Sequence, residues 1–346
     1  MFESLGFETL TAPQAAVWFA LGLGVVFGAL AQITRFCLRR ALVGEDRRQA
    51  AGVWLMALAV AVLGTQAAVT QGWIGFGDHR FMAADLPVLA IVAGGLMFGV
   101  GMVLTRGCIS RMTVLSGSGN LRALTVLVIF AITAHAALKG VLAPVRTTLG
   151  SVTIALDTAA LPGNALVWAG VIAAAALWLA LRSGNRASTL VLAALIGALV
   201  PVGWVGTGFV LYDDFDPVAM QSLSFTAPAA DAIFYTVAST AIPPTFGAGL
   251  VGGVLIGAVI AGVIGGTFRW QSFESPAQTG RYFGGAALMG LGGVLAGGCT
   301  VGAGLAGIPT LSIAAILALG SILAGGLLGD LALRPRKSTE ALQPAE

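Results

Sequence analysis

Residues 97–108 read MFGVGMVLTRGC, an apolar stretch in which a glycine precedes the final cysteine by nine residues. The same arrangement recurs in residues 26–37, VFGALAQITRFC, and in residues 288–299, LMGLGGVLAGGC. A fourth stretch, residues 195–206, reads LIGALVPVGWVG and carries Gly206 where the others carry cysteine. Recurrence of one pattern along the chain indicates an internal repeat.

The composition around these stretches places the chain in a membrane. Of 346 residues, 57% are hydrophobic and only 10% are charged, whereas soluble domains carry about 25% charged residues. Too little polar surface is available to cover a water-facing globule, so we expect an all-α polytopic membrane protein that lies in the lipid bilayer. The formal net charge of +3 comes from scattered basic residues, which predicts no nucleic-acid partner.

Nine apolar runs are long enough to cross a bilayer, which takes about 20 mainly apolar residues. The predicted spans are residues 14–34, 49–73, 86–105, 123–138, 161–181, 187–211, 247–268, 282–303 and 306–329. The run 217–242 is interrupted by Pro228, so we expect a re-entrant or interfacial element there. Residues 1–346 are predicted to form one membrane domain, with residues 331–346 as a cytoplasmic tail.

The basic residues predict the orientation. With nine spans, only Arg80, Lys139 and Arg146 of the 18 Lys and Arg residues fall on the side of the N-terminus, which leaves 18 − 3 = 15 on the other side. Because Lys and Arg accumulate in cytoplasmic loops, we expect a periplasmic N-terminus and a cytoplasmic C-terminus.

The repeat and this orientation together predict the architecture. The first two copies lie on spans that run inward, and the copies at 195–206 and 288–299 lie on spans that run outward. This is an inverted-topology repeat of four, one and four spans: residues 14–140, a connector helix at 161–181, and residues 187–330. Secondary transporters use such repeats and bind substrate where the halves meet.

The cysteines are the main candidate site. Three cysteines are too few for a disulfide framework, and we expect free thiols. One cysteine in an apolar helix is usually a packing residue, but three in repeat register beside glycines favour a functional role. Residues 116–120 after Cys108, and the glycines and Pro309 after Cys299, carry helix-start signals, so we expect two helix N-termini that could bind an anion.

Four segments resemble one family when they are taken together. They are Arg35-Phe36-Cys37, Thr105-Arg106-Gly107-Cys108, residues 222–228 and residues 297–302. In their order and spacing the chain resembles the YeeE/YedE sulfur-transport family over about residues 15–330. The resemblance implies an hourglass-shaped, nine-span protein of the bacterial inner membrane in which Cys37, Cys108 and Cys299 pass thiosulfate along. It also implies a TusA-like sulfurtransferase partner, which here would be a separate cytoplasmic protein.

Residues beside the thiols are secondary candidates for the substrate path: Gly107, Ser110, Gly206, Gly298, Thr300 and Arg106. Arg106 and Arg111 could steer an anion, although we favour the reading that they anchor the chain at the cytoplasmic face. His135 lies within a span, where a functional role and a neutral helix-bridging hydrogen bond are both open. The sequence predicts neither a metal site nor a cofactor.

Transport of thiosulfate is the leading hypothesis, because backbone N–H groups can bind its oxygens while a soft thiol meets its terminal sulfur. A membrane sulfurtransferase that forms a cysteine persulfide is the alternative from another class. A carrier of selenium or another sulfur compound with the same fold is the third. The sequence shows no activating base or cation within the cysteine motifs, which favours transport over covalent chemistry.

Overall fold

A computed structural model describes residues 10–333, and in this range the regular secondary structure is almost entirely helical. The α-helices are α1 (Ala12–Thr34), α2 (Leu38–Val43), α3 (Arg47–Thr70), α4 (Val88–Leu104), α5 (Ile109–Gly117), α6 (Leu121–Lys139), α7 (Ala143–Gly150), α8 (Ala165–Leu181), α9 (Ala187–Val205), α10 (Thr226–Ala238), α11 (Phe246–Ile264), α12 (Pro276–Leu295) and α13 (Ile313–Leu333). Two short 3₁₀-helices are η2 (Arg80–Met82) and η5 (Ile308–Thr310), and two π-helices are η3 (Gly206–Val210) and η4 (Thr300–Gly307). Strands β1 (Asp85–Leu86) and β2 (Ile154–Ala155) pair antiparallel.

The prediction of an all-α polytopic membrane protein is confirmed. Within residues 10–333, eight helical segments are long and apolar enough to cross a bilayer. The predicted span at 161–181 forms α8, which has only 17 residues because it begins after the capping residue Asn164. Residues 217–242 contain α10, whose 13 residues are too few to span. Pro228 lies in the first turn of α10, where a helix needs no N–H group from it.

Close helix packing explains many of the glycines. Helices α1 and α11 approach so closely that a Cβ atom added to Gly28 would lie 2.2 Å from the carbonyl oxygen of Val254, and one added to Gly257 would lie 2.0 Å from that of Val25. Small residues at such points let membrane helices pack backbone to backbone. The α1–α11 contact is therefore defined by glycines on both helices.

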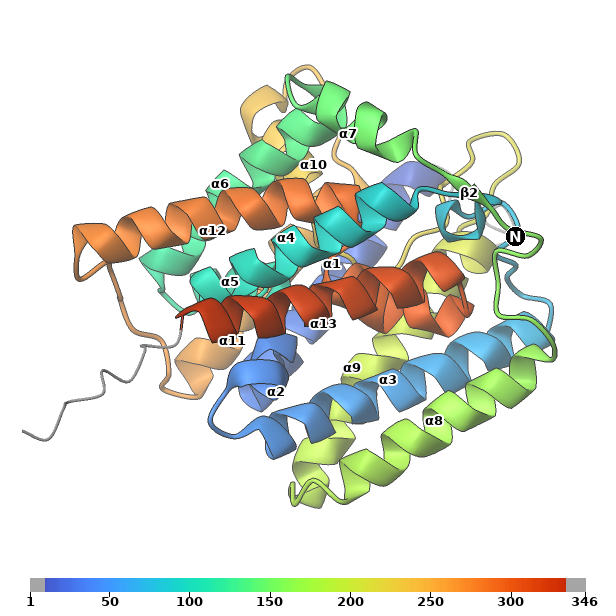
Figure 1. Cartoon of the computed structure of the whole chain (residues 1–346), viewed down its shortest axis with the longest axis horizontal. Coiled ribbons are helices and arrows are strands. Elements are labelled where there is room, and N and C mark those ends of the chain that lie inside the picture. The colour runs from blue at the N-terminus through green and yellow to red at the C-terminus, as the bar shows by residue number, and fades with distance from the viewer. Residues whose placement is uncertain (1–9, 334–346) are drawn as a thin grey trace, which may run out of the picture.

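The helices pack in matching pairs (Figure 1). Figure 1 shows α12, α4 and α13 side by side through the middle of the molecule, with α3 and α8 along one flank. The first four spans are α1, α3, α4 and α6, and they match the last four, α9, α11, α12 and α13, in that order. Under this exchange the contact between α1 and α11 corresponds to the contact between α9 and α3, and the contact between α4 and α13 corresponds to that between α12 and α6. Helices α4 and α12 correspond to each other and are in contact. This is the set of contacts that a twofold exchange requires, while the boundaries at residues 14–140 and 187–330 remain predictions.

The start of the last span differs from the prediction. Pro309 belongs to η5, and Leu311 then adopts a left-handed conformation with φ of 58°. Helix α13 begins only at Ile313, where the Ser312 hydroxyl accepts a hydrogen bond from the N–H of Ala315 at 3.4 Å. The sequence predicts that Pro309 opens the last span, but the helix of that span begins four residues later.

Candidate functional site: three thiols between two cavities

Each cysteine begins a short helix after a long one has ended. Arg35, Arg106 and Gly297 adopt left-handed conformations, with φ of 54°, 61° and 73°. In all three cases the cysteine follows two residues later, at the position that caps α2, α5 or η4. The left-handed residue turns the chain and breaks the helix. The spacing of glycine and cysteine in the sequence therefore marks a real, repeated break in the helices.

The three thiols are free, buried and close to one another. Cys108 and Cys299 are at most 1% exposed, and Cys37 is 7% exposed. Cys37 and Cys108 are near enough for their thiols to interact, and Cys299 is within electrostatic range of Cys108. The Ser110 hydroxyl lies 3.2 Å from the Cys108 sulfur. The sequence prediction that these cysteines and Ser110 lie together agrees with this arrangement.

Backbone N–H groups surround the thiols. The N–H of Gly302 donates to the Cys299 sulfur at 3.4 Å, and the N–H of Phe225 also points toward it. The N–H groups of Arg40 and Arg111 point toward Cys37 and Cys108. The cysteines themselves thus occupy the helix N-termini, where N–H groups are free to meet an anion.

Residues 116–120 do not form the predicted cradle beside the thiols. They end α5 and begin α6, where the Asn120 side chain accepts from the N–H of Ala123 at 3.1 Å. The amide of Asn120 also donates to the Gln271 side chain, and this contact is exposed. The helix-start signal was correct, but it belongs to the turn between α5 and α6, whose backbone hydrogen-bonds to Arg269 and Gln271.

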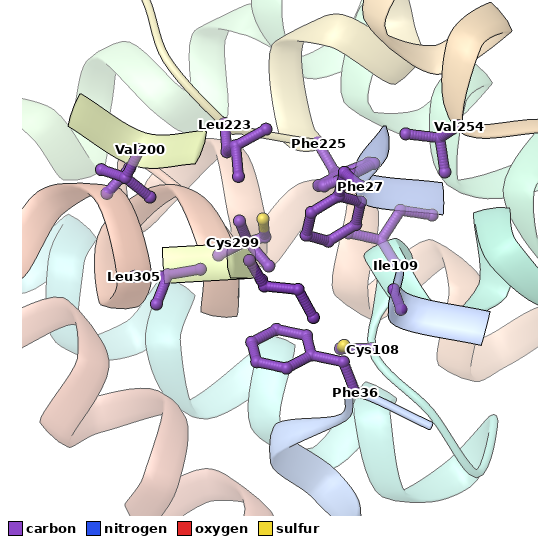
Figure 2. Packing of buried hydrophobic residues seen from close by; sticks show 14 of the residues in the cluster. Phe27, Phe36, Cys108, Ile109, Val200, Leu223, Phe225, Val254, Cys299 and Leu305 are labelled. Carbon is purple, nitrogen blue, oxygen red and sulfur yellow. The ribbon is translucent and has the colours of Figure 1, made fainter. Parts of the chain in front are cut away.

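Aromatic rings close the space around the thiols (Figure 2). The ring of Phe27 lies 6.2 Å from that of Phe36 and 5.4 Å from that of Phe225, measured between centroids. Figure 2 shows Phe36 beside Cys108, with Leu223 and Phe225 on the side of Cys299. All these side chains are buried. The thiols therefore lie in a closed apolar layer.

A cavity of about 720 Å³ lies on one side of this layer, and we call it the first cavity. It is lined by parts of residues 72–81, by Trp204, by parts of residues 208–231, and by Gly302 and Ala306. Burial and the neighbouring Arg80 lower the pKa of His79 to about 4, so His79 is neutral near pH 7. The charged residues of the lining are Arg80, Asp78 and Asp231. The indole N–H of Trp204 is buried and has no hydrogen-bond partner within residues 10–333.

A second cavity of about 660 Å³, the arginine cavity, is lined by Arg35, Arg39, Arg40, Val43, Gly44, Glu45, Asp46 and Arg106. Arg40 binds Asp46 through both of its carboxylate oxygens. This hydrogen bonding holds the pKa of the Asp46 carboxyl below its usual value. The remaining guanidinium groups give this cavity a positive lining.

The cysteine layer separates the two cavities. Gly302 lines the first cavity and donates to Cys299, whereas Arg35 and Arg106 line the arginine cavity two residues before Cys37 and Cys108. The hourglass form that the family resemblance implies needs a cavity on either side of a closed layer and stays a prediction.

Arg111 differs from its predicted role as an anchor at the membrane surface. Its Nη1 donates to the carbonyl oxygen of Ala31 at 3.2 Å and to the Gln32 side chain at 3.4 Å. Its guanidinium lies within electrostatic range of Cys37 and Cys108. The inference that no cation accompanies the cysteine motifs is therefore wrong for Arg111. Its position three residues after Cys108 was the signal that could have revealed it.

The secondary candidates are placed differently from one another. Thr300 lies close to Cys108, and its hydroxyl is buried. Gly107 and Gly298 belong to the breaks before Cys108 and Cys299. Gly206 continues the helix with φ of −57°, and a Cβ atom there would lie 2.3 Å from the Phe19 ring. The fourth copy thus has no helix break at its last residue.

His135 stacks on the Phe234 ring of α10, with 4.6 Å between ring centroids. In residues 10–333, no group of three or more His, Cys, Asp or Glu side chains is arranged to hold a metal ion.

Comparison with known proteins agrees with this geometry. Residues 31–328 match the Sulphur transport family. The chain is 26% identical to the thiosulfate transporter TsuA of Escherichia coli K12 over 314 residues, which covers 82% of this chain and 84% of the relative. It is 24% identical to the thiosulfate transporter TsuA of Spirochaeta thermophila over 332 residues, with 86% and 93% of the two chains covered. The chain therefore belongs to the Sulphur transport family, a family of multi-pass membrane proteins that move sulfur compounds.

Proposed function

We propose that this protein imports thiosulfate, or a closely related sulfur oxyanion, across the bacterial inner membrane through the cysteine layer. The observation that carries the proposal is the burial of three free thiols between two cavities. Two relatives that match over most of their length are named thiosulfate transporters.

The path begins at the first cavity, which faces the periplasm if the bias of basic residues sets the orientation. Arg80 attracts the anion there and lies within electrostatic range of Cys299. Thiosulfate oxygens then meet the N–H groups beside Cys299, and its terminal sulfur meets the thiol. The buried hydroxyl of Thr300 offers the next donor, close to Cys108.

Several weak contacts in series suit conduction better than one strong site. A neutral thiol is a weak hydrogen-bond donor and a polarisable neighbour for sulfur, so it can bind the ion without trapping it. Past Cys37 the ion reaches the arginine cavity, which would open to the cytoplasm. A separate TusA-like sulfurtransferase could accept the sulfur compound there.

The first test replaces single thiols. We expect Cys108→Ala and Cys299→Ala to abolish growth on thiosulfate as sole sulfur source, while growth on sulfate and the amount of protein in the membrane stay normal. Cys37→Ser should keep partial activity, because a hydroxyl still donates a hydrogen bond. Wild-type growth of both alanine variants would reduce the cysteines to packing residues.

The second test separates transport from sulfur transfer. Proteoliposomes containing the protein are given thiosulfate labelled on both sulfur atoms, and the label inside is identified. Intact thiosulfate inside supports the proposal. Sulfite released outside, with one added sulfur on Cys108 or Cys299 in the intact mass, would instead establish a membrane sulfurtransferase.

The orientation is tested by topology reporters fused after residues 45, 78, 184, 214 and 340. We expect them to read cytoplasmic, periplasmic, cytoplasmic, periplasmic and cytoplasmic in that order. A reversed pair at 184 and 214 would remove the inverted topology of the second half.

A further inference from the structure

The two halves of the repeat differ at one position beside the thiols. The third residue after each cysteine directs its backbone N–H toward that thiol, and it is Arg40 after Cys37, Arg111 after Cys108 and Gly302 after Cys299. The first half therefore adds guanidinium groups where the second half has only backbone. The thiol layer is chemically asymmetric from one cavity to the other.

Of the two arginines, Arg40 is already neutralised. It binds the carboxylate of Asp46 and the carbonyl oxygen of Arg35. Arg111 has no carboxylate within 4 Å among residues 10–333. Arg111 is thus a positive charge within electrostatic range of Cys37 and Cys108 that no neighbouring acid balances.

The side chain of Arg111 is held in place with donors to spare. Both of its hydrogen bonds, to Ala31 and Gln32, use Nη1. Gln32 is itself fixed by donating to the Thr267 hydroxyl at 3.2 Å. Within the described part of the chain, Nε and Nη2 of Arg111 make no hydrogen bond, so a guanidinium with five N–H groups keeps part of its fork free.

We propose that Arg111 receives the doubly charged oxyanion as it leaves the thiols and selects for its charge. This inference rests on the proposed function and extends it to substrate class. The thiols contact the polarisable sulfur, and the guanidinium of Arg111 binds the anionic oxygens. The path therefore selects for both the terminal sulfur and the charge of the ion. Arg35 and Arg40, also within electrostatic range of Arg111, line the arginine cavity, toward which the ion continues.

The experiment compares two ions of similar shape and different charge. Thiosulfate is a dianion, and methanethiosulfonate carries the same terminal sulfur with one negative charge. Uptake of each labelled ion into proteoliposomes is measured for the wild type, Arg111→Gln and Arg111→Lys. Arg122→Gln is the matched control, because Arg122 pairs with Glu274 at the surface.

We expect Arg111→Gln to lower thiosulfate uptake and to reduce the preference for thiosulfate over methanethiosulfonate about tenfold, the size of one hydrogen bond to a charged group. Arg111→Lys keeps the charge without the fork, so it should keep most of the preference while its turnover falls. Arg122→Gln should keep both. A purely structural role would lower uptake of the two ions equally.

Unchanged preference in Arg111→Gln would overturn the inference. If that variant does not fold, Arg111→Lys decides alone, because loss of the preference despite the retained charge would equally overturn it. Both results would leave the proposed function intact as long as Cys108→Ala and Cys299→Ala abolish uptake. Normal uptake by those two variants would instead contradict the proposed function itself.

Discussion

Two neighbouring glycines on α11 should respond in opposite ways to the same substitution. Gly253 faces α1, and a Cβ atom there would lie 2.1 Å from the carbonyl oxygen of Leu21 and 3.0 Å from the N atom of Val25. Gly252 is next to it in the chain, yet a Cβ atom there would have no neighbour within 4 Å. The same Gly→Ala substitution at these two positions therefore tests whether α1 and α11 are in close contact, because only the surroundings of the added methyl group differ.

The magnitude follows from the geometry. An ordinary contact between a methyl carbon and a backbone oxygen is at least about 3.4 Å, so Gly253→Ala must push α1 and α11 apart by about 1 Å, and overpacking of this kind costs about 1–3 kcal/mol. Gly252→Ala gains helix propensity of up to about 1 kcal/mol. We expect the free energies of unfolding of the two variants to differ by about 2–4 kcal/mol.

Thermal unfolding of the detergent-purified variants measures this difference, and uptake into proteoliposomes reports its effect on the site. Because α1 leads directly into the break before Cys37, Gly253→Ala should also lower uptake. Gly252→Ala should melt at or above the wild-type temperature and transport normally. Equal melting temperatures for the two variants would show that the α1–α11 interface is not packed as described.

Three further outcomes are expected. Arg80→Gln should raise the KM for external thiosulfate about 30-fold at low salt. The reason is that the attraction between two unit charges 4 Å apart in water is about 1 kcal/mol, and that between one charge and a dianion is about twice this. Arg146 lies outside the first cavity, so Arg146→Gln should leave the KM unchanged. His79 has a pKa of about 4 in the folded protein and about 6.5 in the unfolded chain, so the unfolded state binds the extra proton between these values and stability should fall as pH drops from 6.5 to 4. His79→Gln should flatten that slope in melts recorded from pH 7 to pH 4, and an unchanged slope would refute the assignment. Mild oxidation should join Cys37 to Cys108 in a disulfide visible by peptide mass spectrometry, whereas a disulfide that includes Cys299 would contradict the arrangement of the thiols.

The fold was predictable because the membrane makes strong demands on sequence. A span needs a long uncharged run, and this requirement located eight of the long helical segments. The boundaries were harder, since capping side chains set them locally. Capped by Ser275, α12 begins at Pro276, six residues before the predicted start, and the left-handed Leu311 delays α13 until Ile313.

The site was only partly predictable. The spacing of glycine and cysteine revealed the thiols because each cysteine follows a left-handed break, and this turn has a fixed length. Gly206 matched the spacing by residue type alone, since no left-handed residue precedes it. Arg80 and His79 reach the first cavity from a loop, whose course no periodic pattern specifies. The sequence favours a role for Arg111 as a membrane anchor, because an anchoring arginine and a substrate-binding arginine look alike in sequence when they lie near the end of a span.

The closed layer between the cavities also concentrates the membrane voltage. Water in each cavity carries the potential of its own compartment inward, so most of the voltage falls across the short distance between Gly302 and Arg106. Moving a dianion across this layer toward an interior at −100 mV costs about 4.6 kcal/mol of electrostatic free energy, twice the value for one charge. At equilibrium its concentration inside would be lower by a factor of about 2,000. Net import then depends on rapid consumption inside or on cations that cross with it, and the step past Cys108 is where the voltage acts.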